Sequence, residues 1–468
     1  MTVDYDDIQG TILQGYRVDH ARHFVLQVID AAGARAFLGS LVDPSSGLPQ
    51  ITTAARWTVK PTSFLNVGIT APGLAELGQP TSGFPASFTL GATSTTTATL
   101  VGDVGDSAPA NWVDGLADGA NVHVILSLWV HRDVDVLEQV SATLRSAFAG
   151  ALAELAAQDA TALPANKVHF GYTDNISQPT VAGAPPPKHP RPDDQPIAPT
   201  GEFLLGYPNH NDSVYRVTPE SLSKNSSFGV FRLLEQDVAG FDAWLAAAAP
   251  QAGIDVEMLA AKVCGRWRNG VPLVLSPTTA TPQPPLPPEE INDYTYVPAD
   301  TYGYSCPVGA HMRRCNPRNE QVIAGGSLHR IIRRAMPYGP PYDPAQPDDV
   351  ARGLVGWFIN ADISNQFELI MSQWVNGSTF VMSPPPPPPP PSPAPNPVNN
   401  ISGQDVILGI NDPTSSFTLS TAASGTTPFS NQKLTGFGPF VTTRGGAYCY
   451  LPSISALKVI GAPAPHAR

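Results

Sequence analysis

Residues 23–41 read HFVLQVIDAAGARAFLGSL, a stretch in which an expected strand passes directly into an expected helix. Residues 23–30 are apolar and include β-branched side chains, which favours a buried strand. The Ala-rich residues 31–41 have the composition of a helix. Further along the chain, residues 63–70 and 121–131 are again typical of strands. These segments are the framework from which we predict the fold.

Helices are expected between and after these strands. Residues 72–77 predict a short helix, and residues 134–157 predict a long one because apolar side chains recur at three- and four-residue spacing. The Thr-rich residues 92–100 are expected to form a surface loop. The resulting order, β-α-β-β-α-β, is typical of a ferredoxin-like unit.

The second half of the chain repeats this order after a Pro-rich break at residues 182–200. The predicted elements are a strand at 227–234, helices at 238–249 (with Trp244 on the apolar face) and 255–264, a strand at 353–361, a helix at 363–375 and a hairpin-like strand pair at 438–450. A second Pro-rich loop is expected at 278–290. Two similar α+β units are the simplest architecture that accounts for the repeat.

The predicted fold class is therefore α+β, with two ferredoxin-like domains of the dimeric α+β barrel type, antiparallel sheets and peripheral helices. We place the N-terminal domain at residues 1–181, a Pro-rich connection at 182–226 and the C-terminal domain at 227–468. A polyproline run at 383–397 is interpreted as a stiff, exposed insertion, although a PxxP ligand for a partner domain is also conceivable.

Composition excludes several classes of protein. The chain has 468 residues, 42% of them hydrophobic, which is enough to bury a sizeable core. A net charge of −12 makes general nucleic-acid binding unexpected. No apolar run reaches the roughly 18 residues that cross a bilayer, and no signal peptide is visible, so we expect a soluble, cytoplasmic protein. The four cysteines, Cys264, Cys306, Cys315 and Cys449, are interpreted as buried, reduced thiols.

One segment carries an unusual concentration of positive charge. Residues 306–339 read CPVGAHMRRCNPRNEQVIAGGSLHRIIRRAMPYG. Between His311 and Arg334 the only acidic residue is Glu320, and the arginines there are Arg313, Arg314, Arg318, Arg330, Arg333 and Arg334. A solvated basic face is one interpretation. Because apolar side chains such as Ile331 and Met336 lie among the arginines, an anionic ligand with a large apolar body is the other.

Two histidines of this segment are candidate metal ligands. His329 is interpreted as an ordinary core or surface residue. His311 follows Pro307, Gly309 and Ala310, and these small residues would let a flat ligand approach. Spacing alone leaves a metal-binding role for His311 as one of two open interpretations.

Several motifs taken together resemble the dye-decolourising peroxidase family of haem enzymes over nearly the whole chain. They are DIQG at 7–10, HFGYTDNISQP at 169–179, GEFLLGYP at 201–208, GRWRNGVPL at 265–273, AHMRRCNPR at 310–318, RRAMPYG at 333–339 and RGGAY at 444–448. Each motif is moderately specific. Their occurrence in the same order makes the resemblance strong.

The resemblance implies a role for four residues. His311 corresponds to the proximal ligand of the haem iron, Asp174 to the distal acid–base residue, and Arg333 to the distal arginine that stabilises negative charge. Arg318 corresponds to a position that contacts a haem propionate. The implied cofactor is haem b, one per chain, and the implied substrates are hydrogen peroxide and aromatic reducing compounds such as dyes and phenols. The sequence leaves monomer and homodimer open.

Two departures from the family pattern keep alternatives open. Asn175 stands where a glycine usually follows the catalytic acid, and asparagine is the residue that best tolerates the positive φ suited to glycine. Ala335 stands where a glycine often follows the two arginines and would reshape the distal pocket. A haem carrier or sensor with little turnover is therefore the alternative function, and an interaction scaffold with a decayed site is a third.

Further expectations concern the surroundings of the haem. An aspartate base has a low intrinsic pKa, so we expect an acidic pH optimum. Asp362 is expected to hydrogen-bond the proximal imidazole and raise its donor strength. Trp357 and Phe358, in the strand before Asp362, are expected near the haem.

Overall fold

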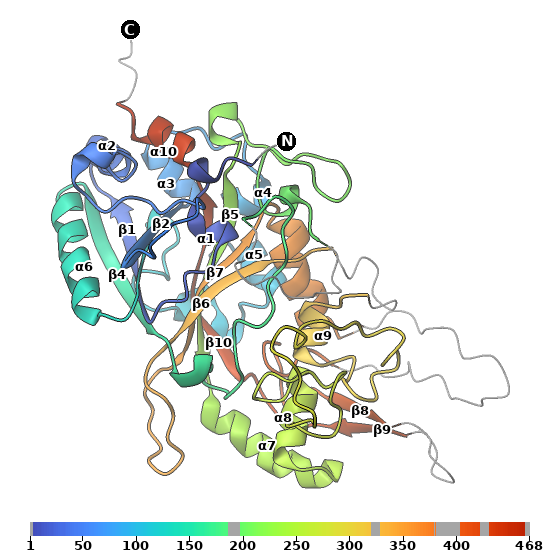
Figure 1. Ribbon diagram of the computed structural model, residues 1–468. Helices are drawn as coiled ribbons and strands as arrows, with labels where there is room; N and C mark the ends of the chain where they lie inside the picture. The colour runs from blue at the N-terminus through green and yellow to red at the C-terminus, as the bar shows by residue number, and fades with distance from the viewer. Residues whose placement is uncertain are drawn as a thin grey trace.

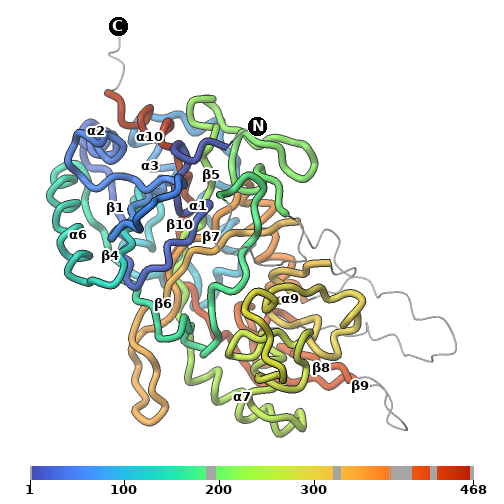
Figure 2. Tube along the Cα trace, in the orientation of Figure 1, coloured from blue at the N-terminus to red at the C-terminus, as the bar shows by residue number. Residues whose placement is uncertain are grey.

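The structure, a computed structural model, describes residues 3–185, 197–319, 328–378, 380, 403–421 and 430–463. The predicted polyproline insertion at 383–397 lies outside these residues, as do positions 186–196 of the Pro-rich connection and Glu320. Figures 1 and 2 show the path of the chain, with the first residues and the last helix at the same end of the molecule.

An eight-stranded sheet with the order β4-β1-β3-β2-β10-β5-β7-β6 organises the molecule (Figure 1). All its paired neighbours are antiparallel. Its strands are β1 His20–Val28, β2 Ser63–Ile69, β3 Val124–Val130, β4 Leu152–Thr161, β5 Ser227–Gln236, β6 Ile332–Tyr338, β7 Gly353–Asn360 and β10 Val441–Leu451. A separate two-stranded sheet pairs β8 Phe417–Thr421 with β9 Ser430–Leu434.

The sheet consists of two four-stranded halves with the same order of strands. In the N-terminal half, β1, α2 (Ala31–Ser40), β2, β3, α6 (Val134–Phe148) and β4 follow one another as β-α-β-β-α-β. In the C-terminal half, the same order runs through β5, α7 (Val238–Ala252), β6, β7, the π-helical segments Ser364–Glu368 and Ile370–Val375, and β10. The ferredoxin-like prediction is confirmed for both halves, which meet where Ile69 pairs with Tyr450. The exact domain boundaries stay predictions.

The remaining helices surround these two halves. They are α1 Gly10–Leu13, α3 Ala71–Glu76, α4 Ala86–Leu90, α5 Thr95–Val101, α8 Val256–Cys264, α9 His311–Cys315 and α10 Ile454–Gly461. Side-chain caps fix several of their starts: Asp255 accepts the Met258 N–H at the start of α8, and Ser453 accepts the Ala456 N–H at the start of α10. Among the residues that the structure describes, no helix combines the length and apolar character needed to cross a membrane.

The helices of the two halves pack differently. In the N-terminal half, Phe148 of α6 lies between Phe37 of α2 and Phe24 of β1, with ring centroids 5.8 and 6.2 Å away, so both helices lie on the sheet. In the C-terminal half, α7 packs instead on α8, on β9 and on the aromatic segment before β10, where Trp244 contacts Phe437. Figure 1 shows α7 and α8 beside α9, β8 and β9, away from α2 and α6.

Several predicted elements are wrong in detail. The helix expected at 134–157 ends at Phe148, and Gly150 with φ +77° turns the chain into β4, whose alanines imitate a helical composition. The loop expected at 92–100 contains α5, capped by Ser94. The strand pair expected at 438–450 is the single strand β10, because a bulge between Thr443 and Gly445 accommodates the glycines without a turn.

Candidate active site

A cavity of about 540 Å³ lies on the C-terminal half of the sheet. Successive residues of a strand point to opposite faces, so alternate residues share one wall. The sheet wall of the cavity follows this rule, with Arg232, Leu234 and Gln236 of β5, Leu354, Gly356 and Phe358 of β7, and Arg333 and Ala335 of β6. The C-terminal half therefore presents to this cavity the kind of face that the N-terminal half covers with helices.

The opposite wall comes from the segments that follow α7. Cys264 ends α8, Arg266 follows it, and α9 contributes His311, Met312 and Cys315. Residues 407–411 close one side, and residues 168–178 close another. The three residues that the sequence placed around one haem, Asp174, His311 and Arg333, all line this cavity.

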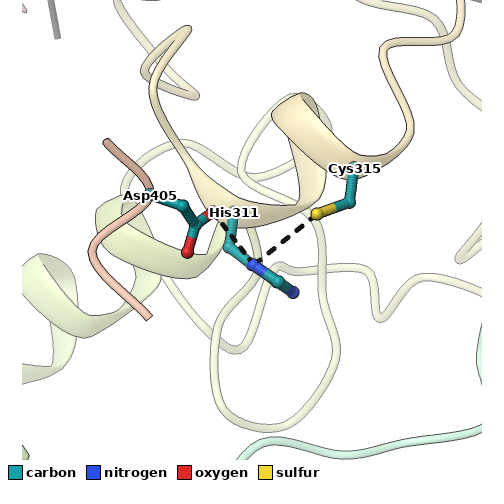
Figure 3. Close-up of side chains that lie close together, drawn as sticks. All are labelled: His311, Cys315 and Asp405. Carbon is teal, nitrogen blue, oxygen red and sulfur yellow. Dashed lines mark hydrogen bonds and ion pairs between the residues drawn. The ribbon is translucent and has the colours of Figure 1, made fainter. Parts of the chain in front are cut away.

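His311 is held by a buried carboxylate. It begins α9, and its ring Nδ1 lies 3.0 Å from Asp405 Oδ2 and 3.8 Å from the Sγ of Cys315, one helical turn further on. Figure 3 shows the other ring nitrogen, Nε2, pointing away from both groups. The three side chains could together hold a metal ion, since their ligand atoms lie within 4.8 Å of one another. A hydrogen bond at Nδ1, however, leaves Nε2 as the ring nitrogen that can bind a metal.

Asp405 is itself fixed and charged. The side chain is fully buried, and its Oδ1 accepts the backbone N–H groups of Ile407 and Leu408, both at 2.8 Å. Burial alone would raise the pKa of Asp405, but the charges of His311 and Arg314 hold this pKa below its ordinary value. For the imidazole of His311, burial alone would lower the pKa, but the neighbouring Cys315 and Asp405 raise this pKa well above its usual value. The contacts at Nδ1 therefore hold the ring in one orientation.

Asp174 lies on a loop that hydrogen bonds keep in place. Its backbone N–H donates to the Asn166 carbonyl at 2.8 Å, and Thr173 donates both its N–H and its hydroxyl to the Arg268 carbonyl. The following residue, Asn175, has φ +61°, so the expectation that asparagine adopts the positive φ suited to glycine is confirmed. The departure from the family pattern therefore leaves the local backbone in the conformation that the loop requires.

Arg333 is tied to the same loop. Its Nη2 donates to the Ser177 carbonyl at 2.7 Å, and its backbone N–H donates to Gln178 Oε1 at 3.0 Å. Asp174 and Arg333 thus come from one hydrogen-bonded unit, although the loop and strand β6 are far apart in the sequence. The strand itself was not predicted, because its two consecutive arginines conceal the pattern.

Arg318 is not brought to the cavity. Its guanidinium is buried, donates to the carbonyls of Asn292 and Tyr294 and to Asn292 Oδ1, and lies over the Tyr294 ring. The expected contact with a haem propionate is therefore not supported, because the loop that precedes α9 occupies this guanidinium. Arg313 and Arg314 are buried in the same way: Arg313 donates to the Cys306 carbonyl, and Arg314 to the Trp374 carbonyl. Most of the arginine cluster supports loops.

The arginine that the sequence analysis missed is Arg266. It is 3% exposed, it lines the cavity, and its Nε has no hydrogen-bond partner within the described residues. An orphaned buried donor in an otherwise largely apolar cavity indicates an anionic group of a ligand. The motif GRWRNGVPL at 265–273 contained this residue, but nothing in its local pattern separated a cavity arginine from a structural one.

The expectations for the strand before Asp362 are only partly met. The acid that bonds His311 is Asp405, so the prediction of Asp362 is wrong; Asp362 instead accepts the backbone N–H and the side-chain amide of Asn365. Phe358 lines the cavity, but Trp357 points to the opposite face, where its Nε1 donates to Ser127 Oγ.

His329 is an ordinary surface-facing residue, as expected. Its Nδ1 lies next to the Asn365 carbonyl, its ring meets the Trp374 ring edge-on, and it is not among the residues that line the cavity. Nothing in these contacts favours His329 over His311 as a metal ligand.

The cavity fits a flat, apolar cofactor that carries a metal and acidic groups. Apolar side chains such as Phe358, Phe367 and Leu408 form much of its wall. Its volume lies in the range of cofactor sites. His311 would supply a nitrogen ligand to the metal, and the unsatisfied Nε of Arg266 would meet a carboxylate.

Comparisons with known proteins agree with this geometry, although no family model matches the chain. A dye-decolorizing peroxidase of Exidia glandulosa is 27% identical over 97% of this chain and 87% of its own length. The solved structure of a dye-decolorizing peroxidase in complex with 2,6-dimethoxyphenol is 29% identical, covers 98% of this chain and all of its own, and has a TM-score of 0.79. A second solved structure, of a dye-decolorizing peroxidase with a heme pocket engineered for asymmetric sulfoxidation, is 25% identical, covers 98% of this chain and all of its own, and also has a TM-score of 0.79. This chain is a homologue of the dye-decolorizing peroxidases, in sequence over almost its whole length and in fold.

Proposed function

We propose that the protein is a haem peroxidase that uses hydrogen peroxide to oxidise dyes, phenols and similar aromatic donors, with one haem b per chain. The observation that carries this proposal is the convergence of His311, Asp174 and Arg333, from three separate parts of the chain, on one cavity. The names of the homologues support the reaction class. The identity of the haem and the location in the cell stay predictions.

The bound haem would supply an iron centre that peroxide oxidises and that aromatic donors then reduce. The His311 Nε2 would hold the iron, and the Asp405 carboxylate would keep the proton of the ring on Nδ1 and strengthen the ring as a donor. Arg266 would bind an acidic edge of the cofactor through its free Nε.

Asp174 would move the proton. One of its carboxylate oxygens would accept a proton from one oxygen of hydrogen peroxide and pass it to the other oxygen, which then leaves as water. The Arg333 guanidinium would stabilise the negative charge that develops as the O–O bond breaks. The hydrogen bond from its Nη2 to the Ser177 carbonyl holds this guanidinium in place beforehand, and the bond from the Arg333 backbone N–H to Gln178 fixes the strand beside it.

The test is steady-state peroxidase turnover of the haem-loaded protein with a phenolic donor. The proposal predicts peroxide-dependent turnover that the Asp174→Asn variant loses while the haem absorption is kept. A haem carrier would show the absorption without turnover. Asn175 adopts the positive φ suited to glycine, so the presence of asparagine at this position no longer favours a haem carrier.

A further inference from the structure

A second, outer cavity of about 830 Å³ adjoins the first. Asp174, Asn175 and Arg333 are among the residues that line both cavities. These side chains therefore form a partition, with the site cavity on one side and the outer cavity on the other. A molecule in the outer cavity would contact the groups that act on peroxide.

The walls of the outer cavity carry an excess of positive charge. Arg17, Lys167, Arg333 and Arg334 contribute cations, against the carboxylates of Asp174 and Asp19. Asp19 is already engaged, since its Oδ2 accepts the Arg132 N–H at 2.8 Å and lies 2.9 Å from His131 Nδ1. In a chain whose net charge is −12, this local excess indicates an anionic ligand.

Arg334 is the least exposed of the three arginines in this wall. Its Nε donates to the Thr11 carbonyl at 2.9 Å and its Nη1 to the Arg333 carbonyl at 3.2 Å. No carboxylate pairs with it within the described ranges, and its Nη2 has no hydrogen-bond partner there. Burial lowers the pKa of Arg334 to about 10, so the group stays charged at neutral pH at a cost that an anion would offset.

The remainder of the wall suits an aromatic ring. Leu13, Ile176 and Met336 supply apolar surface. Hydrogen peroxide alone, which is small and uncharged, would need neither the apolar surface nor the cations.

We propose that the outer cavity binds aromatic donors that carry a carboxylate group, with Arg334 pairing with that carboxylate and Arg17 and Lys167 attracting it at the rim. A planar carboxylate matches the guanidinium geometry. The role of these compounds as donors rests on the proposed function, whereas their binding does not.

Binding is tested by titrating the purified, haem-loaded protein calorimetrically with 3,5-dimethoxybenzoate and with the uncharged 3,5-dimethoxybenzamide. We expect the carboxylate to bind about tenfold tighter than the amide, Arg334→Gln to remove this preference, and Arg334→Lys to restore part of it. The matched control is Arg216→Gln, an exposed arginine paired with Glu220, which should keep the preference. Equal affinities for the two probes, or an unchanged preference in Arg334→Gln, would overturn the proposal.

A double variant, Arg17→Gln with Lys167→Gln, keeps the test decisive if Arg334→Gln does not fold. It should weaken carboxylate binding several-fold and reduce its dependence on salt; an unchanged affinity contradicts the proposal.

Turnover gives a separate readout. The ratio of kcat/KM for 4-hydroxy-3,5-dimethoxybenzoate to that for 2,6-dimethoxyphenol should fall about tenfold in Arg334→Gln, through KM. An unchanged ratio overturns the proposal. A protein that binds the carboxylate through Arg334 but turns over neither donor supports this binding site and refutes the peroxidase function.

Discussion

The two halves of the sheet have the same strand order but different surroundings. In the N-terminal half, α2 and α6 lie on the sheet, and all seven residues of β3 are buried. In the C-terminal half, α7 packs against α8 and β9, and alternate residues of β5 and β7 line a cavity of about 540 Å³. The site therefore arises because α7 is displaced from the sheet and loops are inserted, and not because the strand topology differs. Loops placed on a rigid sheet commonly carry function in this way.

The largest effect is expected at the cavity histidine. His311→Ala should abolish haem uptake, seen as the loss of the Soret absorption after hemin is added, and reduce peroxidase turnover to background. The control is His329→Ala, because His329 lies next to the Asn365 carbonyl and not in the cavity wall. If His329→Ala lost haem and His311→Ala kept it, the ligand assignment would be wrong.

Replacing the cavity carboxylate should slow the reaction with peroxide but leave the haem in place. For Asp174→Asn we expect the rate constant measured by stopped-flow absorption to fall by about 10²–10⁴, which corresponds to roughly 3–5 kcal/mol of barrier. Asparagine preserves the size of the side chain, so the haem spectrum should not change. An unchanged rate constant would exclude Asp174 as the group that moves the proton.

A pair of leucine variants compares the packing of the two halves directly. Leu126 of β3 is fully buried, so Leu126→Ala should lower the free energy of unfolding by about 2–5 kcal/mol. Leu354 of β7 is only partly buried and faces the cavity, so Leu354→Ala should cost clearly less in the haem-free protein. Urea unfolding measures both. Equal losses would mean that the C-terminal half is packed as tightly as the N-terminal half.

The carboxylate behind His311 should influence how tightly the cofactor is held. Asp405→Asn removes the charge but keeps an oxygen acceptor, and we expect haem affinity to fall about 10- to 100-fold. The rate of haem transfer to an apoprotein acceptor measures this change. Asp362→Asn is the control, since Asp362 bonds Asn365 and not His311, so this variant should leave the rate unchanged. An equal effect of the two variants would contradict the assigned role of Asp405.

A change that appears only on acidification is expected at a histidine of the N-terminal half. Burial lowers the pKa of His23 from its ordinary 6.5 to about 3. Between these values the unfolded chain binds a proton that the folded chain does not, so stability is lost as the pH falls from about 6.5 toward 3. The contribution is roughly 1.4 kcal/mol per pH unit.

His23→Gln should remove this contribution, so that the stabilities of variant and parent converge as the pH falls. Urea unfolding at several pH values measures the difference. Parallel stability curves would show that His23 does not titrate in this way.

Much of the strand framework could be predicted because it is local. Strands β1, β2, β3, β5 and β7 and helices α2, α7 and α8 follow from runs of apolar residues and their spacing. The boundary between α6 and β4 could not be predicted, because alanines occur in both elements and Gly150 alone marks the turn between them. Strand β6 was concealed by the pair Arg333 and Arg334, whose side chains face the cavities.

The site was predictable where a motif places a residue and unpredictable where only the tertiary structure does. His311, Asp174 and Arg333 lie in recognisable motifs and line one cavity. Asp405 lies far along the chain, and nothing near it in sequence indicates that it bonds His311. The difference between Arg266 and Arg318 likewise depends on the tertiary structure. Both guanidinium groups donate to the loop at 291–294, but only Arg266 also lines the cavity.

The most direct test of the proposed function is the absorption spectrum of the protein after hemin is added, recorded before and after one equivalent of hydrogen peroxide. We expect a Soret band in the parent and in Asp174→Asn, with a rapid spectral change on peroxide addition in the parent and a much slower one in the variant. A protein that takes up no hemin, or a parent and variant that respond to peroxide at the same rate, would contradict it.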